Sequence, residues 1–192
     1  MKNLILIGAG GHCKSCIDVI EEQDEYKIIG LIDLKEKIGK EILGYKIIDC
    51  DENIKKYIDN DTYFLITLGQ IKTAKRRKEL YDNLTVFGAK FATVISPYAR
   101  VSSHAKILCG SIILHNALVN AGVEIGNNCI INSKALLEHD VSIGNHCHIS
   151  TAAVLNGGVN VCDCSFVGSN SVVVQGAHIP FGSFIKAGTL VK

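Results

Sequence analysis

The sequence has no excess of either charge, no long hydrophobic run and no recognisable leader peptide, and each absence argues against a class of protein. Its 192 residues carry 20 Lys plus Arg against 19 Asp plus Glu, a balance that argues against a nucleic-acid partner. Its apolar stretches are much shorter than the roughly 20 residues that span a bilayer, and the N-terminal MKNLILIGAGG lacks the h-region and cleavage site of a signal peptide. We therefore expect a cytoplasmic protein without a membrane partner.

Metal-ligand spacing is also missing, although the chain has eight cysteines. Cys13 and Cys16 form a CxxC pair and Cys162 and Cys164 a CxC pair, but neither has a second pair at zinc-finger spacing. In the absence of an export signal, disulfides are not expected either. We interpret the cysteines as reduced thiols that act as small hydrophobic side chains, and we predict no metal site.

The charges that are present divide the chain into two parts. Residues 1–94 hold 15 basic and 15 acidic side chains, whereas residues 95–192 hold 5 and 4. Pro97, which restricts Ser96 to extended geometry, stands where the pattern changes. We therefore predict two domains, 1–94 and 95–192.

The first part alternates short apolar runs with helix-like stretches. The pattern predicts strands over residues 2–7, 27–32 and 63–68, and helices over 14–22 and 73–84. Strand, helix and strand in this order indicate a small α/β, Rossmann-like domain with a parallel sheet.

The second part is a six-residue repeat. Every sixth residue from Ile95 to Val191 is Ile, Leu or Val, seventeen in succession. If these residues filled such positions about 30% of the time, the run would arise by chance roughly once in 10⁹. The residue four places later is usually Ala, Ser or Cys. A period of six does not fit an α-helix, but it fits a solenoid of short parallel strands with three hexads per triangular coil, the aliphatic residue pointing inward and the small one near the corner.

The hexad pattern resembles that of the hexapeptide-repeat acyltransferases, and this resemblance implies an all-β left-handed parallel β-helix. Three further segments narrow the likeness: Gly8-Ala9-Gly10-Gly11-His12, residues 131–140 (INSKALLEHD) and residues 149–158 (ISTAAVLNGG). Together they resemble the family of sialic acid O-acetyltransferases and bacillosamine-type N-acetyltransferases of nucleotide-linked 4-amino sugars. The resemblance implies an acetyl-CoA-dependent N-acetyltransferase that serves bacterial surface glycan biosynthesis. It also implies a homotrimer whose sites lie between neighbouring subunits.

The resemblance also assigns roles to residues. His139 corresponds to the base that takes the acceptor's proton, and Asp140 to the acidic residue that orients it, where related enzymes commonly have Glu. His148 matches a second functional histidine of the N-acetyltransferase branch, and Asn132 a polar position near the substrate. We expect the remaining outward histidines, His104, His115, His146 and His178, to be solvated surface residues.

Four positions are expected to bind acetyl-CoA. Gly157 and Ser169 match places where backbone groups meet the pantetheine arm, and a missing side chain at Gly157 lets another group approach closely. Lys186 and Lys192 supply positive charge near the C-terminal coils, where the phosphates of the cosubstrate are expected. Coil corners and solvated lysines are the alternatives at these positions.

The N-terminal domain is expected to bind the nucleotide sugar. The turn Gly8–His12 follows a strand and opens a helix, so its backbone N–H groups can receive a phosphate or another polar group. The resemblance adds Gly10, Gly11, His12, Asp33, Gly69 and Gln70 as substrate-binding positions. The GxGxxG fingerprint is incomplete because residue 13 is Cys, which makes a redox dinucleotide enzyme the weaker interpretation.

Two alternatives to amine acetylation stay open at this point. One is O-acetylation of a sialic acid or related nonulosonic acid, which His148 disfavours. The other is a non-catalytic hexapeptide-repeat scaffold or sugar-nucleotide sensor, because some proteins with this coil lack acyltransferase activity.

Overall fold

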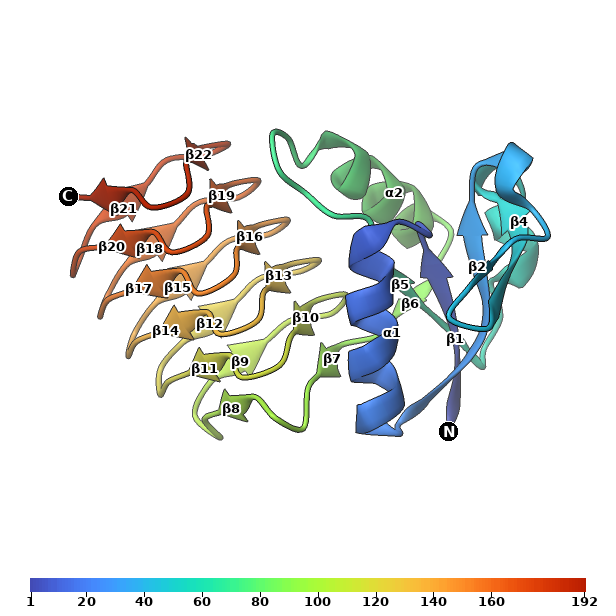
Figure 1. The fold of residues 1–192 in the computed structure, drawn as a ribbon, viewed down its shortest axis with the longest axis horizontal. Coiled ribbons are helices and arrows are strands. Elements are labelled where there is room, and N and C mark those ends of the chain that lie inside the picture. The colour runs from blue at the N-terminus through green and yellow to red at the C-terminus, as the bar shows by residue number, and fades with distance from the viewer.

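The computed structural model describes residues 1–192, and its N-terminal part contains a six-stranded sheet (Figure 1). The strand order is β3-β4-β2-β1-β5-β6, parallel throughout except for the β3–β4 hairpin. The elements are β1 (Lys2–Ile7), α1 (Gly11–Gln23), β2 (Tyr26–Asp33), a 3₁₀ turn (Lys35–Lys37), β3 (Glu41–Ile42), β4 (Tyr45–Cys50), a 3₁₀ helix (Asp51–Tyr57), β5 (Thr62–Ile66), α2 (Lys75–Val86) and β6 (Lys90–Phe91). The predicted parallel sheet is confirmed.

The alternation of side chains along β1 explains why a helix covers each face of this sheet. Leu4 and Leu6 pack in one cluster with α1, whereas Ile5 and Ile7 pack in another with α2. Several predicted boundaries were wrong by two residues or more; helix α2, for example, covers Lys75–Val86 rather than residues 73–84. Helix α1 begins at Gly11 rather than residue 14, because Gly8, at φ +102°, already completes the turn. Strand β5 ends at Ile66 rather than residue 68.

The C-terminal part is a triangular prism of two-residue strands, and the strands of successive coils pair in parallel, 18 residues apart. Three sheets form its sides. We call them the docking face, the apolar face and the polar face. The docking face contains β7 (Val94–Ile95), β10 (Ile112–Ile113), β13 (Ile130–Ile131), β16 (His148–Ile149), β19 (Phe166–Val167) and β22 (Phe184–Ile185). The apolar face contains β8 (Arg100–Val101), β11 (Leu118–Val119), β14 (Leu136–Leu137), β17 (Val154–Leu155), β20 (Val172–Val173) and β23 (Leu190–Val191). The polar face contains β9 (Lys106–Ile107), β12 (Glu124–Ile125), β15 (Ser142–Ile143), β18 (Asn160–Val161) and β21 (His178–Ile179).

The hexad prediction is confirmed residue by residue. The second residue of every strand is the aliphatic one of the repeat, and these side chains fill the prism together with small residues such as Ala135 and Ala153. The first residue of each strand points outward, since successive side chains of a strand alternate. The composition of each outer row therefore decides what that face can contact.

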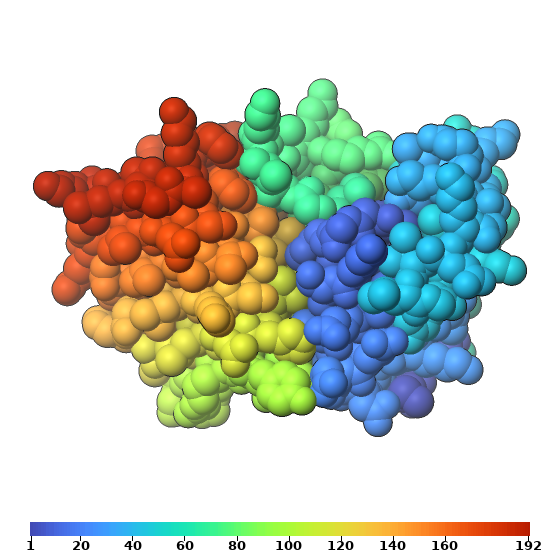
Figure 2. Space-filling model, viewed as in Figure 1, coloured from blue at the N-terminus to red at the C-terminus, as the bar shows by residue number.

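The docking face carries the N-terminal part. Its outward residues Val94, Ile112 and Ile130 are buried in one cluster with Ile17 and Ile20 of α1. Figure 1 shows α1 between the sheet and the strands of this face, and in Figure 2 the two halves lie in contact along the molecule. The last strand of the first sheet ends at Phe91 and the prism begins at Val94, so we propose that the domains divide here, next to the predicted boundary after residue 94. No helix is long and apolar enough to cross a bilayer.

Candidate active site

His139 and Asp140 lie at an exposed corner of the prism. They form the turn after β14, where the apolar face meets the polar face. Asp140 adopts φ +60°, a left-handed conformation that Asp tolerates better than most residues. Its Oδ2 lies 2.9 Å from Nδ1 of His139. A carboxylate only accepts hydrogen bonds, so Nδ1 carries a proton, and in the neutral ring Nε2 is the nitrogen that can accept one.

Gly157 lies directly beneath this imidazole, one coil further along the prism. The Gly158 N–H donates to the carbonyl of His139 at 2.9 Å, which holds the two turns in register. A Cβ on Gly157 would lie 2.6 Å from both Cε1 and Nε2 of His139. No residue larger than glycine fits there without displacing the ring. The group that approaches Gly157 closely within this chain is therefore the side chain of His139.

His148 lies on another side of the prism. It is the outward residue of β16 on the docking face, and this face is opposite the corner that holds His139. The N-terminal domain covers its side chain, which is 6% exposed. Within one chain, therefore, the structure does not bring the two predicted catalytic histidines together.

Two hydrogen bonds fix the imidazole of His148. Its Nδ1 donates to the backbone carbonyl of Gln70 at 2.6 Å, and the Asn132 side-chain amide donates to its Nε2 at 3.1 Å. Burial lowers the pKa of His148 to about 4. The ring is thus neutral with its proton on Nδ1. Asn132, which the sequence resemblance predicts to lie near the substrate, contacts Nε2 of this ring.

His12 and Gln70 bring unpartnered polar atoms to the same place. The rings of His12 and His148 are 6.4 Å apart, and burial lowers the pKa of His12 to about 3. Neither Nε2 of His12 nor Oε1 of Gln70 has a hydrogen-bond partner. Buried polar atoms without partners are rare and call for an explanation. Gly69, whose Cα faces the His12 side chain, and Gly10 and Gly11, which open α1, complete this junction between the domains.

Asp33 lies at the carboxyl end of β2 and braces the glycine turn. Its carboxylate accepts hydrogen bonds from the Ala9 N–H, the Leu34 N–H and the ammonium group of Lys37. Burial acts to raise the pKa of Asp33, but these donors outweigh it and hold the pKa below its usual value. The side chain borders a cleft of about 300 Å³ with Gly8, Gly10, Leu68 and Arg76 also in its lining. Ligands of parallel α/β sheets bind at this carboxyl edge.

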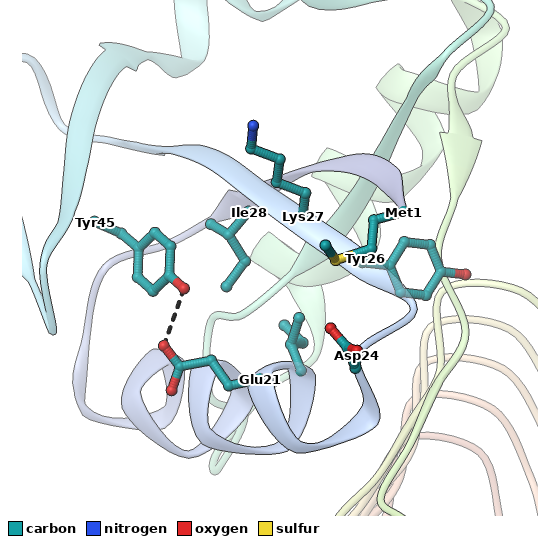
Figure 3. Close-up of a pocket in the computed structure, with 8 residues that line it drawn as sticks. Met1, Glu21, Asp24, Tyr26, Lys27, Ile28 and Tyr45 are labelled. Atoms are coloured by element: carbon teal, nitrogen blue, oxygen red, sulfur yellow. Dashed lines mark hydrogen bonds between the residues drawn. The ribbon is translucent and has the colours of Figure 1, made fainter.

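A second cavity lies at the opposite edge of the same sheet. It measures about 340 Å³ and is lined by Met1, Tyr26, Ile28 and Tyr45 among others, at the amino ends of β1 and β2. Figure 3 shows the Tyr45 hydroxyl bonded to Glu21 across one side of it. None of the predicted site residues reaches this cavity.

The positions expected to bind acetyl-CoA border the apolar face on both of its edges. Gly157 and Lys192 lie on the edge that holds His139, whereas Ser169 and Lys186 lie on the edge shared with the docking face. Ser169 Oγ contacts Ser150 Oγ at 2.9 Å, and both lysines are exposed. Between the edges runs an outward row of Leu118, Leu136, Val154, Val172 and Leu190, with Leu190 57% exposed.

The surface interpretation was wrong for one histidine and incomplete for another. His146 is buried, accepts a hydrogen bond from the Asn128 amide at 3.0 Å and packs edge-on against Tyr81. His115 is half-buried and bonds both Ser96 and Asp18. Each of these histidines contacts the N-terminal domain, His146 through Tyr81 and His115 through Asp18. The repeat pattern alone does not predict where that domain lies. His104 and His178 are exposed.

The cysteines are unpaired and form no metal-binding group. All eight are free, and five of them are buried, in keeping with their interpretation as small hydrophobic side chains. No cluster of three or more His, Cys, Asp or Glu side chains is arranged to hold a metal ion.

Comparisons with known proteins agree with this architecture. Residues 3–84 match the PglD N-terminal domain family. The acetyltransferase domain of PglB from Neisseria gonorrhoeae is 25% identical, with a TM-score of 0.89 over 98% of this chain and 90% of that one; its complex with acetyl coenzyme A is 24% identical, with a TM-score of 0.89 over 100% and 91%. PerB from Caulobacter crescentus, in complex with CoA and GDP-perosamine, is 20% identical, with a TM-score of 0.69 over 97% and 92%. WeeI from Acinetobacter baumannii is 18% identical, with a TM-score of 0.77 over 100% and 97%. No curated protein matches the chain by sequence. The predicted left-handed parallel β-helix behind a small α/β domain is confirmed.

Proposed function

We propose that the chain belongs to the bacillosamine- and perosamine-type family of hexapeptide-repeat N-acetyltransferases, and that it moves acetyl from acetyl-CoA to the 4-amino group of a nucleotide-linked deoxy sugar. The observation that carries this proposal is the His139–Asp140 pair, with a protonated Nδ1 and a free Nε2 above Gly157. A base of this kind is what an amine needs as it attacks a thioester.

The reaction follows from that geometry. The sugar amine forms a C–N bond to the acetyl carbonyl while Nε2 of His139 takes its proton, and the C–S bond then breaks to release the thiolate. The imidazolium returns the proton to this sulfur, so the products are the N-acetyl sugar and CoA. Asp140 keeps Nε2 as the basic nitrogen and stabilises the imidazolium that forms.

The acceptor's nucleotide fits the N-terminal domain. The cleft beside Asp33 and Gly10 offers backbone N–H groups at the start of α1, the usual receptor for a phosphate. The unpartnered atoms of His12 and Gln70 leave a donor and an acceptor free for a polar group of the ligand. The nucleotide of the perosamine substrate bound to PerB is GDP; for this chain we propose a nucleotide sugar of the same class, without choosing its base.

The site is shared between subunits of a homotrimer. His139 is 62% exposed in one chain. The apolar row from Leu118 to Leu190, which passes beside His139 at Leu136, is half-buried or exposed in the same chain. Solvent-exposed apolar rows of this length mark interfaces. A neighbouring copy that covers this row excludes water from His139 and can bring its own His148 and N-terminal domain towards the acceptor.

Mass spectrometry of product tests the proposal directly. The full chain is incubated with acetyl-CoA and, separately, with UDP-, dTDP- and GDP-linked 4-amino sugars and with a free sialic acid. A gain of one acetyl group on a 4-amino sugar, lost in His139→Ala, is the expected result. Mass detection also avoids thiol reagents, which would react with the exposed Cys109.

The other outcomes decide against it. Acetylation of the sialic acid alone assigns the enzyme to O-acetylation of hydroxyl groups. Full activity of a folded His139→Ala variant removes His139 from the role of base. A monomer in light scattering at micromolar concentration, with activity intact, removes the shared site.

A further inference from the structure

Arg77 of α2 is fully buried at the junction of the two domains and has no carboxylate partner. It is 2% exposed, and none of the salt bridges of the structure includes it. Burying a cation is expensive unless its N–H groups are satisfied. Four carbonyl oxygens satisfy Nη1 and Nη2 of Arg77, whereas its Nε–H has no hydrogen-bond partner. Burial lowers the pKa of Arg77 to about 10, which leaves the guanidinium charged at neutral pH.

The guanidinium bonds both domains at once. One nitrogen, Nη1, donates to the carbonyls of Ile66 and Leu68 at 2.8 and 2.7 Å. The other, Nη2, donates to the backbone carbonyl and the side-chain oxygen of Asn128 at 2.9 and 2.7 Å. Ile66 ends β5, whereas Asn128 lies in a prism turn before β13. The planar fork of arginine suits this double attachment, and a lysine ammonium does not.

The attachment leads to His148 through one short turn. Leu68, which Arg77 holds, is followed by Gly69 and by Gln70, whose carbonyl accepts the Nδ1 proton of His148 at 2.6 Å. Gln70 also donates from its side chain to the Ser165 carbonyl of the prism at 3.4 Å. Arg77 therefore fixes the start of the turn whose end fixes the imidazole.

We propose that Arg77 is a positioning residue: it clamps the Leu68–Gln70 turn against Asn128 of the prism and thereby sets the orientation and the tautomer of His148. The expected effect on kcat rests on the proposed function, whereas the effect on the orientation and tautomer of His148 does not. Without the guanidinium, the carbonyls of Leu68 and Asn128 lose buried donors, the turn relaxes, and Gln70 no longer presents a fixed acceptor to His148.

The test compares Arg77→Met and Arg77→Lys with Arg100→Met. Arg100 is a matched control because it lies on the apolar face, away from the docking face that holds His148, and bonds only the Val101 carbonyl. In chain labelled with ¹⁵N-histidine, long-range ¹H–¹⁵N spectra report which ring nitrogen of His148 carries the proton, with His148→Gln identifying the signals. We expect a single Nδ1–H tautomer in the wild type and in Arg100→Met, and a mixture or the Nε2–H form in both Arg77 variants.

Kinetics supply the second readout. A catalytic group displaced by about 1 Å costs on the order of 100-fold in rate, so we expect kcat for the sugar amine to fall about 10- to 100-fold in Arg77→Met, with KM for acetyl-CoA changed less than about twofold. A merely structural role would change stability without this split. Arg77→Lys should lie between Arg77→Met and the wild type.

Asn128→Gly keeps the test informative where the Arg77 variants do not fold. Asn128 sits at φ +53°, which glycine accepts without strain. The variant keeps the backbone carbonyl that accepts from Arg77 and removes the side-chain contacts, which also include hydrogen bonds to His146 and to the Arg77 carbonyl. A smaller shift of His148 from the Nδ1–H towards the Nε2–H tautomer supports the proposal. Unchanged His148 signals together with unchanged kcat in folded Arg77 or Asn128 variants overturn it. Absence of any acetylated sugar from the wild type would refute the proposed function instead, while the spectra still decide on Arg77.

Discussion

Gly157→Ala offers a sharp test of the corner site, because the three atoms nearest to the new methyl group all belong to His139. Its Cβ would lie 2.6 Å from Cε1 and Nε2 of His139, whereas ordinary contacts begin at 3.4 Å, so the ring must move by about 1 Å. His139 is 62% exposed and can swing into solvent. We therefore expect kcat/KM to fall about 100-fold, equivalent to about 2.7 kcal/mol, while the free energy of unfolding changes by less than about 0.5 kcal/mol.

The matched control is Gly176→Ala, one coil further along. Gly176 has open space around its Cα but sits at φ +70°, so alanine there adopts a left-handed conformation at a cost of about 1 kcal/mol. That variant should lose stability and keep its activity, the reverse of Gly157→Ala. Activities come from product mass, and stabilities from urea unfolding at one protein concentration. Full activity in a folded Gly157→Ala variant would refute the argument that His139 acts from its position above Gly157.

Three further predictions address the acid partner, the interface and the buried histidine. Asp140→Asn should keep the fold and lower kcat at least tenfold, since an amide no longer requires the proton on Nδ1 of His139; equal kcat in the two proteins would exclude a role for the charge. Leu136→Glu, on the apolar row beside His139, should convert the trimer to monomers in light scattering and abolish activity, whereas Ser142→Glu on the polar face should do neither. The lowered pKa of His148, about 4 against 6.5 in an unfolded chain, makes the folded state bind its proton more weakly, so stability is complete above pH 6.5 and falls as the pH drops towards 4. For this group alone the loss is about 2 kcal/mol at pH 5, and His148→Gln should remove it from urea unfolding curves recorded at pH 7.5 and 5; an unchanged slope would contradict the assignment.

The prism could be predicted from the sequence because its rule is local. Each inward position is filled by an aliphatic residue at a fixed six-residue interval, from Ile95 to Val191, and every one of them ends a strand. Strand pairing 18 residues apart follows from three hexads per coil. The neighbours Asp140 and His139 could be paired for the same reason, since a turn residue with φ +60° brings adjacent side chains together.

The contacts between the domains could not be predicted in this way. The repeat predicts that His146 and His148 both point away from the prism interior. Nothing in the repeat indicates that Tyr81 packs against His146 or that Gln70 bonds His148. In the sequence, Arg77 is one of several charged residues in the segment that forms α2. Its burial depends on carbonyls at Leu68 and Asn128, whose approach is decided by tertiary packing.

A signal for the docking face nevertheless exists in the outward residue of every third strand. Taken at intervals of 18, these residues are Val94, Ile112, Ile130, His148, Phe166 and Phe184, whereas the polar face shows Lys106, Glu124, Ser142, Asn160 and His178. An apolar row on a solenoid needs a cover, and the docking row has one in α1. His148 is the single polar member of that row. A polar side chain in a buried row must find hydrogen-bond partners, and His148 finds them in Gln70 and Asn132. The apolar face shows a similar pattern from Leu118 to Leu190 without a cover in its own chain. The same reasoning supports our proposal that a second copy of the chain covers this face beside His139.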